Sequence, residues 1–516
     1  MTSATTLMRS LLVYGLSLPL AVFLGYMLAN PMDRPTFYAV ILVLFILMIP
    51  LILKWHHLWL IASWNTTAVI FFMPGSPQLW MGMAALSLLM SVLLHMLSRE
   101  QEFLWVPSLT LSLLFLGVVV LVTAKLTGGF GLRAFGSEVY GGRRYFTLLA
   151  AIIGYFAMTG KRIPAEKAVL YVSLFFLGYA TLAVGGLAGR ISPAFNFLFL
   201  LFPVEELSAL RNDPIGPTML IMRSGGLTML GTGVFCMMLA RHNLRGIFDL
   251  AHPLRLLTFL LFVFIGTLGG FRSMLVQLLL LAGALFFLEG LYRTRALPIT
   301  LALGIVCGGL LMGFAPHLPR SIQRSLAFIP VLDLDADVKM DAQFSNEWRI
   351  RMWQEVLPDV PRYLLKGKGY SFDPKDFDIA RMNLRTASSP ESSEVVGDYH
   401  NGLLSVILPF GIFGVICFFW FIAAAGRVFY MNYKYGGEAL KPINTFLFAF
   451  YIARFIFFLT VFGSLYVDLA LFAGLVGLSV SLNGGVAKRR VEEAPAPTPA
   501  INRFRLSPGL RRPVGV

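Results

Sequence analysis

Residues 402–426 read GLLSVILPFGIFGVICFFWFIAAAG and contain no charged side chain. A helix needs about 20 apolar residues to cross the hydrocarbon core of a bilayer, so this stretch predicts a membrane-spanning helix. Two further runs, residues 11–29 and 168–189, are also long enough and uncharged. The chain is therefore expected to cross a membrane several times.

The composition of the whole chain points to the same class. Of its 516 residues, 57% are hydrophobic and 13% are charged, and the mean hydropathy is +0.74. Soluble domains carry about 25% charged residues, and disordered chains have low hydrophobicity. The composition thus excludes a soluble globular enzyme and a disordered protein. It favours an all-α polytopic membrane protein.

Charge and cysteine content fit this class. Lysine and arginine outnumber aspartate and glutamate by 42 to 27, a net charge of +15. We interpret the excess as membrane topology rather than nucleic-acid binding, because basic residues collect in cytoplasmic loops. All three cysteines fall in apolar stretches, so no disulfide framework is expected. The first apolar run is long enough to span and lacks a cleavage site, so no signal peptide is expected.

Uncharged runs and their flanks predict about fourteen spans with both termini in the cytoplasm. The cytoplasmic connections then carry many Lys and Arg, as expected, although Lys125, Arg133, Arg143 and Arg144 would fall outside. The predicted spans begin near residues 8, 36, 57, 79, 103, 144, 166, 223, 253, 273, 296, 401, 441 and 464.

Long connections divide the chain into four parts. Residues 1–315 form an N-terminal transmembrane bundle, and residues 316–399 form a large outer loop with a small helical subdomain. Residues 400–483 return to the membrane. Residues 484–516 are Pro-rich and basic, which predicts a disordered cytoplasmic tail.

The outer loop ends in Asp398-Tyr399-His400-Asn401, directly before the apolar stretch quoted above. A histidine at the outer mouth of a helix can accept a proton near neutral pH, since its reference pKa is about 6.5. The alternative is an interfacial histidine with a packing role only.

Arginines gather on the same predicted face. Arg272 is the clearest case, because Gly269-Gly270-Phe271-Arg272-Ser273 separates two apolar stretches on the side where positive charge should be sparse. A guanidinium there can bind a phosphate or diphosphate through paired hydrogen bonds. The alternative is an arginine that reaches toward lipid headgroups. The outer arginines are Arg190, Arg211, Arg223, Arg272, Arg349 and Arg351.

Four motifs, in this order, resemble the O-antigen ligase and O-antigen polymerase superfamily. The chain departs from the family pattern at residues 228–230, where TML replaces an Asn-Pro-Asn-like stretch. The motifs are Arg223-Ser-Gly-Gly-Leu227, Phe271-Arg272-Ser273, Arg349-x-x-x-Trp353 with Gly367-Lys-Gly369, and His400-Asn401 with Gly411-Ile-Phe-Gly414.

The resemblance implies a GT-C-like membrane glycosyltransferase that needs no cofactor or metal and works by inversion. Its donor is a glycan on undecaprenyl diphosphate, and its acceptor is a lipid A core sugar (ligase) or another lipid-linked glycan (polymerase). The expected location is the bacterial inner membrane, with the site facing the periplasm. His400 is the expected base. Arg272, Arg349 and Arg223 are expected to bind diphosphate, with Asn401, Trp353, Gly411 and Gly414 in supporting roles.

Two other groups of charged residues have structural interpretations. Asp333, Asp335 and Asp337 form an acidic run that fails as an EF-hand, because Val338 and Phe344 replace the required glycine and glutamate. We interpret it as a solvated loop. Arg454 and Asp468 lie within predicted spans, where charges usually pair, and we expect a structural ion pair.

A lipid-linked glycan flippase or secondary transporter is the rival function, and a membrane scaffold is a third. A transporter would spread charged residues through several spans and show internal repeats. In this chain the candidate groups gather at one face.

Overall fold

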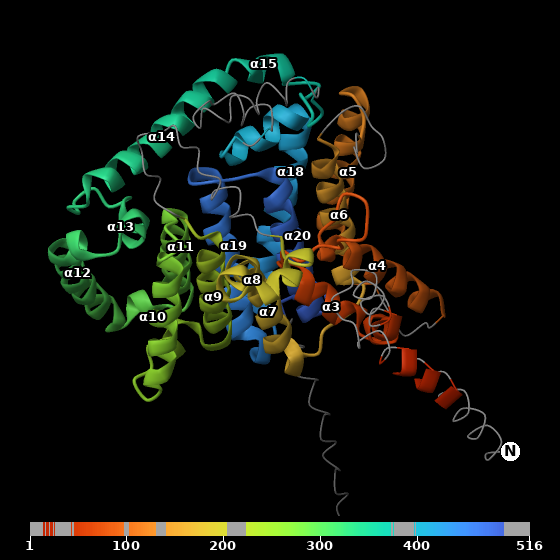
Figure 1. Cartoon of the computed structure of the whole chain (residues 1–516), viewed down its shortest axis with the longest axis horizontal. Coiled ribbons are helices and arrows are strands. Elements are labelled where there is room, and N and C mark those ends of the chain that lie inside the picture. Colours follow the sequence, from red (N-terminus) through yellow and green to blue (C-terminus); the bar gives the residue numbers. More distant parts are fainter. Residues whose placement is uncertain are drawn as a thin grey trace, which may run out of the picture.

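The computed structural model describes residues 46–97, 103–130, 141–203, 223–372 and 399–489, with isolated positions between them. Within these ranges every regular element is a helix (Figure 1), which confirms the all-α prediction for the described part. The first expected span and the tail after residue 489 lie largely outside the described residues.

Seven helical segments in the described part are long and apolar enough to cross a bilayer, so the chain is a multi-pass membrane protein. Residues Ile46–Lys54 and α3 (His56–Ser63) meet at 96° and make an eighth if they count as one broken span. The seven are α4 (Leu79–Leu97), α5 (Pro107–Leu126), the run Ala165–Ala188 containing α7 (Ala168–Leu177) and the start of α8 (Thr181–Ile191), α12 (Ala296–Phe314, extended to His317), α18 (Gly402–Tyr435), α19 (Lys441–Thr460, preceded by Glu438–Leu440) and α20 (Leu465–Asn483).

The predicted count of fourteen is not established by these helices. Four other predicted spans coincide with α6 (Gly142–Thr159), α9 (Gly225–Ile247), α10 (Pro253–Thr267) and α11 (Arg272–Leu288). With 15 and 17 residues, α10 and α11 are about 22–26 Å long, less than the roughly 30 Å hydrocarbon core. α6 and α9 carry charged residues that lower their hydropathy.

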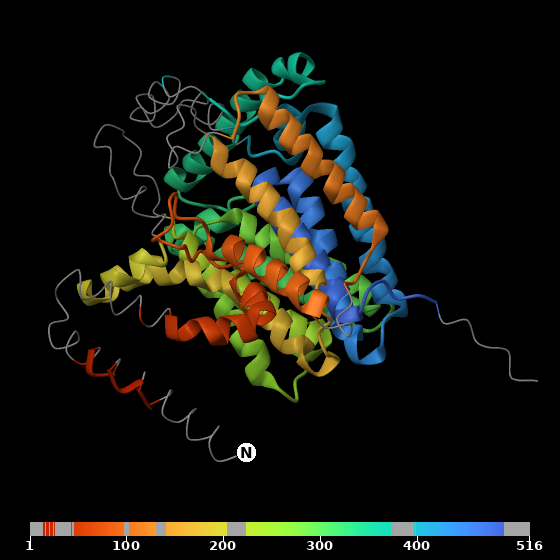
Figure 2. The same cartoon turned by 90° about the vertical axis from the view of Figure 1, so that its right-hand side faces the viewer.

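The centre of the bundle is α20, whose spanning window is 83% buried. It packs against α6 and α18, while α5 lies along α18 (Figure 2). Gly474 allows the Trp64 ring to lie directly on α20, where the indole N–H donates to the Ala470 carbonyl at 3.0 Å. At the other extreme, none of the spanning window of α12 is buried.

α18 is kinked at Gly411, whose φ of 61° and ψ of −160° suit only glycine. Pro409 lacks an N–H and prevents a regular helix at this point. The segment after α15 (Asp359–Tyr363) replaces the lost helical hydrogen bonds: Lys368 N donates to Leu408 O at 2.7 Å, and Gly369 N donates to Pro409 O at 3.0 Å.

A side chain at Gly411 or at Gly367 would collide with the facing backbone. Ile412 N completes the junction by donating to Leu364 O at 2.7 Å. The Gly367-Lys-Gly369 motif and Gly411 therefore form a joint between the segment after α15 and the broken helix.

Residues 320–363 form an arch over one end of the bundle (Figure 1). It contains α13 (Arg320–Leu326), α14 (Ala336–Val356) and α15. Met352 and Val356 of α14 pack with Tyr399, Leu404 and Leu408 at the start of α18. The expected loop subdomain is thus helical in its described part.

Candidate functional site

The ends of three apolar helices are tied together beneath the arch. Ser224 N, at the start of α9, donates to Gly269 O in the α10–α11 turn at 3.0 Å. This bond places Arg223, one residue before the N-cap of α9, near Arg272, the first residue of α11. Two arginines that are distant in sequence thus reach the same end of the bundle.

Arg324, on α13, fixes the arch to this turn. Its guanidinium donates through Nη1 to Gly270 O and through Nε to Asp341 Oδ2, each at 2.5 Å. Ser325 Oγ donates to Thr267 O at 2.8 Å. The Arg324 side chain is only 3% exposed, so we interpret it as the structural connection between the α10–α11 turn, α13 and α14.

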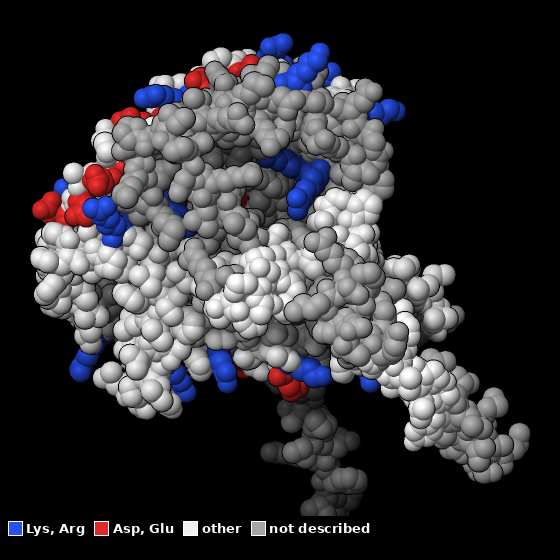
Figure 3. Space-filling model, in the orientation of Figure 1, with Lys and Arg blue, Asp and Glu red and all other residues white. Residues whose placement is uncertain are grey.

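Around this connection lies a group of four arginines, Arg223, Arg272, Arg324 and Arg349, which we name the arginine cluster. Arg223 Nη2 lies 3.5 Å from Asp341 Oδ1, and Arg272 Nη2 donates to Asn346 Oδ1 at 3.1 Å. Figure 3 shows Lys and Arg side chains inside a hollow of the face that it draws.

Burial and the repulsion between neighbouring guanidinium groups lower the pKa values of arginines in the cluster. The pKa of Arg223 is lowered to about 10, first by burial and then by the charges of Arg324 and Arg272, while the Asp341 carboxylate opposes the shift. Burial and the charge of Arg324 also lower the pKa of Arg349. Guanidinium groups remain protonated in proteins, so an anion bound within the cluster would relieve their mutual repulsion. The arrangement is suited to a phosphate-bearing ligand.

His400 lies in the turn before α18 with a φ of 48°, in the left-handed region. Its ring makes edge contacts with Trp348 of α14 at 5.3 Å and with Phe462 of the α19–α20 loop at 4.9 Å, measured between centroids. Trp353 Nε1 donates to Tyr399 O at 2.9 Å and so holds the preceding residue. α14 is the shared element, because Trp348 contacts His400 and the next residue, Arg349, belongs to the cluster.

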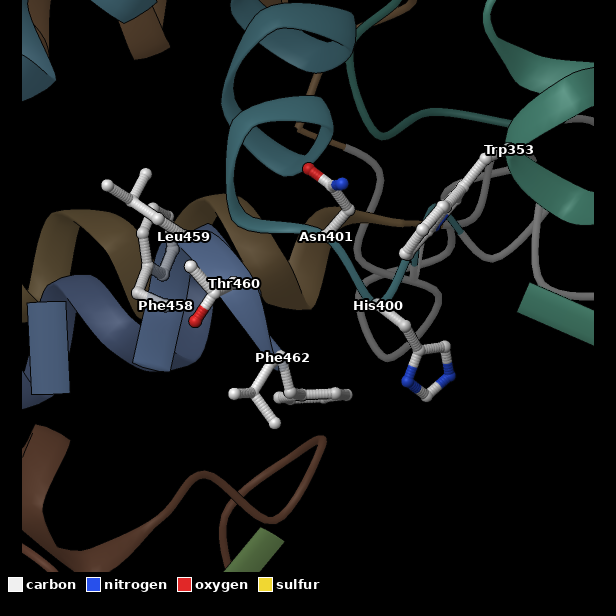
Figure 4. Close-up of a pocket in the computed structure, with 8 residues that line it drawn as sticks. Trp353, His400, Asn401, Phe458, Leu459, Thr460 and Phe462 are labelled. Atoms are coloured by element: carbon white, nitrogen blue, oxygen red, sulfur yellow. The ribbon is translucent and has the colours of Figure 1, made fainter. Parts of the chain in front are cut away.

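A small pocket beside His400 is lined by groups from three elements (Figure 4). Trp353 comes from α14, His400 and Asn401 from the start of α18, and residues 458–462 from the end of α19 and its loop. The pocket combines an imidazole with aromatic surfaces, which suits a sugar hydroxyl beside a proton acceptor.

Asn401, Gly411 and Gly414 determine the start and the shape of α18. Asn401 is the N-cap of α18, and its Oδ1 accepts from Leu404 N at 3.1 Å. Gly411 forms the kink described above, and a side chain at Gly414 would meet the Phe410 side chain. Asn401 thus caps the helix next to His400, while the glycines act on helix shape.

Several residues that the sequence placed on the outer face are not part of the arginine cluster. Arg351 is 68% exposed, and its guanidinium lies 3.8 Å from Glu347. Arg211 and the side chain of Arg190 lie outside the described residues, as does Asp398.

Sequence reasoning missed Arg324, Asp341, Trp348 and Phe462. Arg144 is a further basic residue at this end: its guanidinium lies over the Tyr370 ring at 5.4 Å and over the Tyr466 ring at 4.7 Å. These contacts account for one of the basic residues that broke the predicted charge rule.

The acidic run has basic partners in its own neighbourhood. Asp333 pairs with Lys339 at 3.0 Å, and Arg320 lies 3.4 Å from Asp335 and 3.7 Å from Asp337. In the described part of the chain, no three His, Cys, Asp or Glu residues gather as metal ligands would.

The predicted pair in the membrane is confirmed. Arg454 Nε donates to Asp468 Oδ1 at 2.9 Å, and Ser464 N donates to Asp468 Oδ2 at 2.8 Å. Asp468 is fully buried. Because Ser464 ends the loop that carries Phe462, the ion pair supports the loop beside His400.

Comparison with known proteins agrees with the motif analysis. The O-antigen ligase family matches residues 256–419, a range that contains Arg272, Arg324, Asp341, Arg349 and His400. Arg223 and Phe462 lie outside the matched range. No curated protein matches the chain. Residues 256–419 thus form an O-antigen ligase domain by this comparison, in agreement with the resemblance seen in the sequence motifs.

Proposed function

We propose that this protein transfers a glycan from undecaprenyl diphosphate to an acceptor sugar at the periplasmic face of the bacterial inner membrane. The observation that carries the proposal is that α14 joins the His400 ring to the arginine cluster at one end of the bundle. The O-antigen ligase domain supports a glycosyltransferase of this type.

In the proposed reaction, His400 accepts the proton of the acceptor hydroxyl. The hydroxyl oxygen attacks the anomeric carbon of the donor sugar from the side opposite the diphosphate, and the bond from that carbon to the diphosphate oxygen breaks. This single displacement inverts the anomeric centre. Arg223, Arg272 and Arg349 stabilise the charge that develops on the lipid diphosphate. The arginines supply this stabilisation, so the step is proposed to need no metal.

Basic residues at the end of the bundle opposite His400 support a periplasmic location of the site. α9, α11 and α18 run away from His400, and their far ends meet where Leu244 N donates to Glu289 and Tyr433 O–H donates to Leu288 O. Basic residues lie in the last turns of these helices or shortly after them and fit a cytoplasmic side. They include Arg241, Arg245, Arg293, Arg295, Lys434 and Lys441.

The sidedness is tested with a single cysteine at Ser345 of α14, in a variant without Cys236, Cys307 and Cys417. An impermeant thiol reagent should label it in intact spheroplasts. Labelling that requires lysis would place the site on the cytoplasmic side.

Activity is tested by adding undecaprenyl-diphosphate-linked glycan to the purified full chain with either a lipid A core acceptor or a second lipid-linked glycan. Product with the first acceptor identifies a ligase, and product with the second identifies a polymerase. Transfer should persist in a chelator. Full loss that magnesium or manganese restores would contradict the metal-free reaction.

The arginine cluster is tested by donor binding. Arg349→Ala should weaken binding, while Arg351→Ala on the same helix should not, because Arg351 is exposed and paired with Glu347. Normal binding by both Arg349→Ala and Arg272→Ala would overturn the diphosphate role. Vectorial movement of donor without any transfer product would favour the flippase.

A further inference from the structure

One carboxylate lies within the arginine cluster. Asp341 accepts from the buried Arg324 through Oδ2, and its Oδ1 faces Arg223. The two contacts differ in kind. The Arg324 contact is short and its side chain is 3% exposed, whereas the Arg223 contact is 3.5 Å long and Arg223 is 37% exposed. Arg324 is therefore fixed to Asp341, and Arg223 is able to exchange this partner for another anion.

The net positive charge of the cluster favours the exchange of Asp341 for a more highly charged anion. Its four guanidinium groups and the Asp341 carboxylate leave three positive charges among the described residues. Asp341 raises the pKa of Arg223, whereas Arg324 and Arg272 lower it, so the carboxylate offsets part of the repulsion among the guanidinium groups. A diphosphate bound to Arg223 would take over this role at the expense of the Asp341 contact.

We propose that Asp341 is an internal counter-anion that competes with the lipid diphosphate for Arg223 and thereby promotes release of the diphosphate product. The proposal rests on the proposed function, because it assumes that the cluster binds diphosphate. Asp341 is a positioning residue in this scheme: it makes no contact with the reacting atoms and acts through Arg223.

The test compares two isosteric substitutions that change the charge of the site in opposite directions. Asp341→Asn removes the competing charge but leaves an oxygen that can accept from Arg324. Asn346→Asp adds a carboxylate beside Arg272, to which Asn346 Oδ1 is now bonded at 3.1 Å. Asp337→Asn is the matched control, since Asp337 lies on the same helix, is 58% exposed and faces Arg320.

Binding of inorganic pyrophosphate to the purified full chain is measured by titration calorimetry without added metal. Asp341→Asn should bind about tenfold more tightly, and Asn346→Asp about tenfold more weakly, as expected for one unit charge in a partly buried site. Asp337→Asn should bind like the wild type. The differences should shrink at high salt.

Turnover gives a second readout. Asp341→Asn should lower both KM for the donor and kcat, because the product leaves more slowly, whereas a purely structural role would lower kcat without lowering KM. If Asp341→Asn does not fold, Asn346→Asp decides alone. Unchanged or weaker binding by Asp341→Asn, or unchanged binding by Asn346→Asp, overturns the counter-anion role. Failure of the wild type to bind pyrophosphate instead overturns the diphosphate site of the proposed function.

Discussion

Replacing Arg454 with methionine should destabilise the protein through the buried ion pair of α19 and α20. Asp468 is fully buried and accepts two bonds from Arg454 and one from Ser464 N. Arg454→Met leaves this carboxylate without its counter-charge. Removing one partner of a buried pair costs about 3–5 kcal/mol, because the remaining ion stays desolvated.

A second variant distinguishes the effect of the unpaired Asp468 charge from the effect of losing the packing of the Arg454 side chain. In Arg454→Met combined with Asp468→Asn, the buried charge is gone and the amide oxygen can still accept from Ser464 N. This double variant should recover most of the lost stability. Arg362→Met serves as the control, because Arg362 is exposed and a surface substitution typically changes stability by about 0.5 kcal/mol or less.

The measurement is equilibrium unfolding of the purified variants in mixed detergent and SDS micelles, followed by tryptophan fluorescence. Glycan transfer should decline in the single variant and recover in the double variant, because Ser464 ends the loop that places Phe462 against His400. Stability of Arg454→Met within about 1 kcal/mol of the wild type would refute the reasoning, since it is well below the cost of an unpaired buried charge.

Three further substitutions test the site. Gly411→Ala should cost about 1–3 kcal/mol or more in unfolding experiments, because Gly411 has a positive φ and a Cβ there would lie 2.4 Å from Leu364 O; Gly283→Ala, with open space around it, should cost nothing. Asn401→Ala should lose about 0.5–2 kcal/mol of helix capping, with transfer reduced, whereas Asn401→Ser should retain most of both; equal transfer by the two would contradict the capping role. Arg272→Lys should weaken donor binding despite its conserved charge, because an ammonium cannot form the paired bonds of a guanidinium, and binding at the wild-type level would show that charge alone suffices.

Some features of the site could be predicted from short stretches of sequence. His400 and Asn401 stand between a polar loop and an uncharged run, so the start of α18 and a histidine at its mouth followed from hydropathy. Arg454 and Asp468 followed from the cost of charge in a membrane. Each of these predictions depends on a few neighbouring residues or on one strong energy term.

Other features depend on contacts between distant segments. Arg324 and Asp341 meet because α13 folds back on α14, and no periodic pattern in a polar loop indicates that contact. Phe462 is an ordinary apolar residue until the α19–α20 loop brings it to the imidazole. Hydropathy alone does not decide the number of spans, because α10 and α11 are short and the segments before and after Trp55 meet at 96°.

The central claim is that His400 acts as the base beside a diphosphate-binding arginine cluster. It is tested most directly by comparing glycan transfer and donor binding for purified His400→Ala and wild-type protein. Loss of a general base typically costs about 10² to 10⁴ in rate, so the variant should transfer at that reduced rate while it binds donor normally. Transfer at the wild-type rate by a folded His400→Ala protein would contradict the assignment.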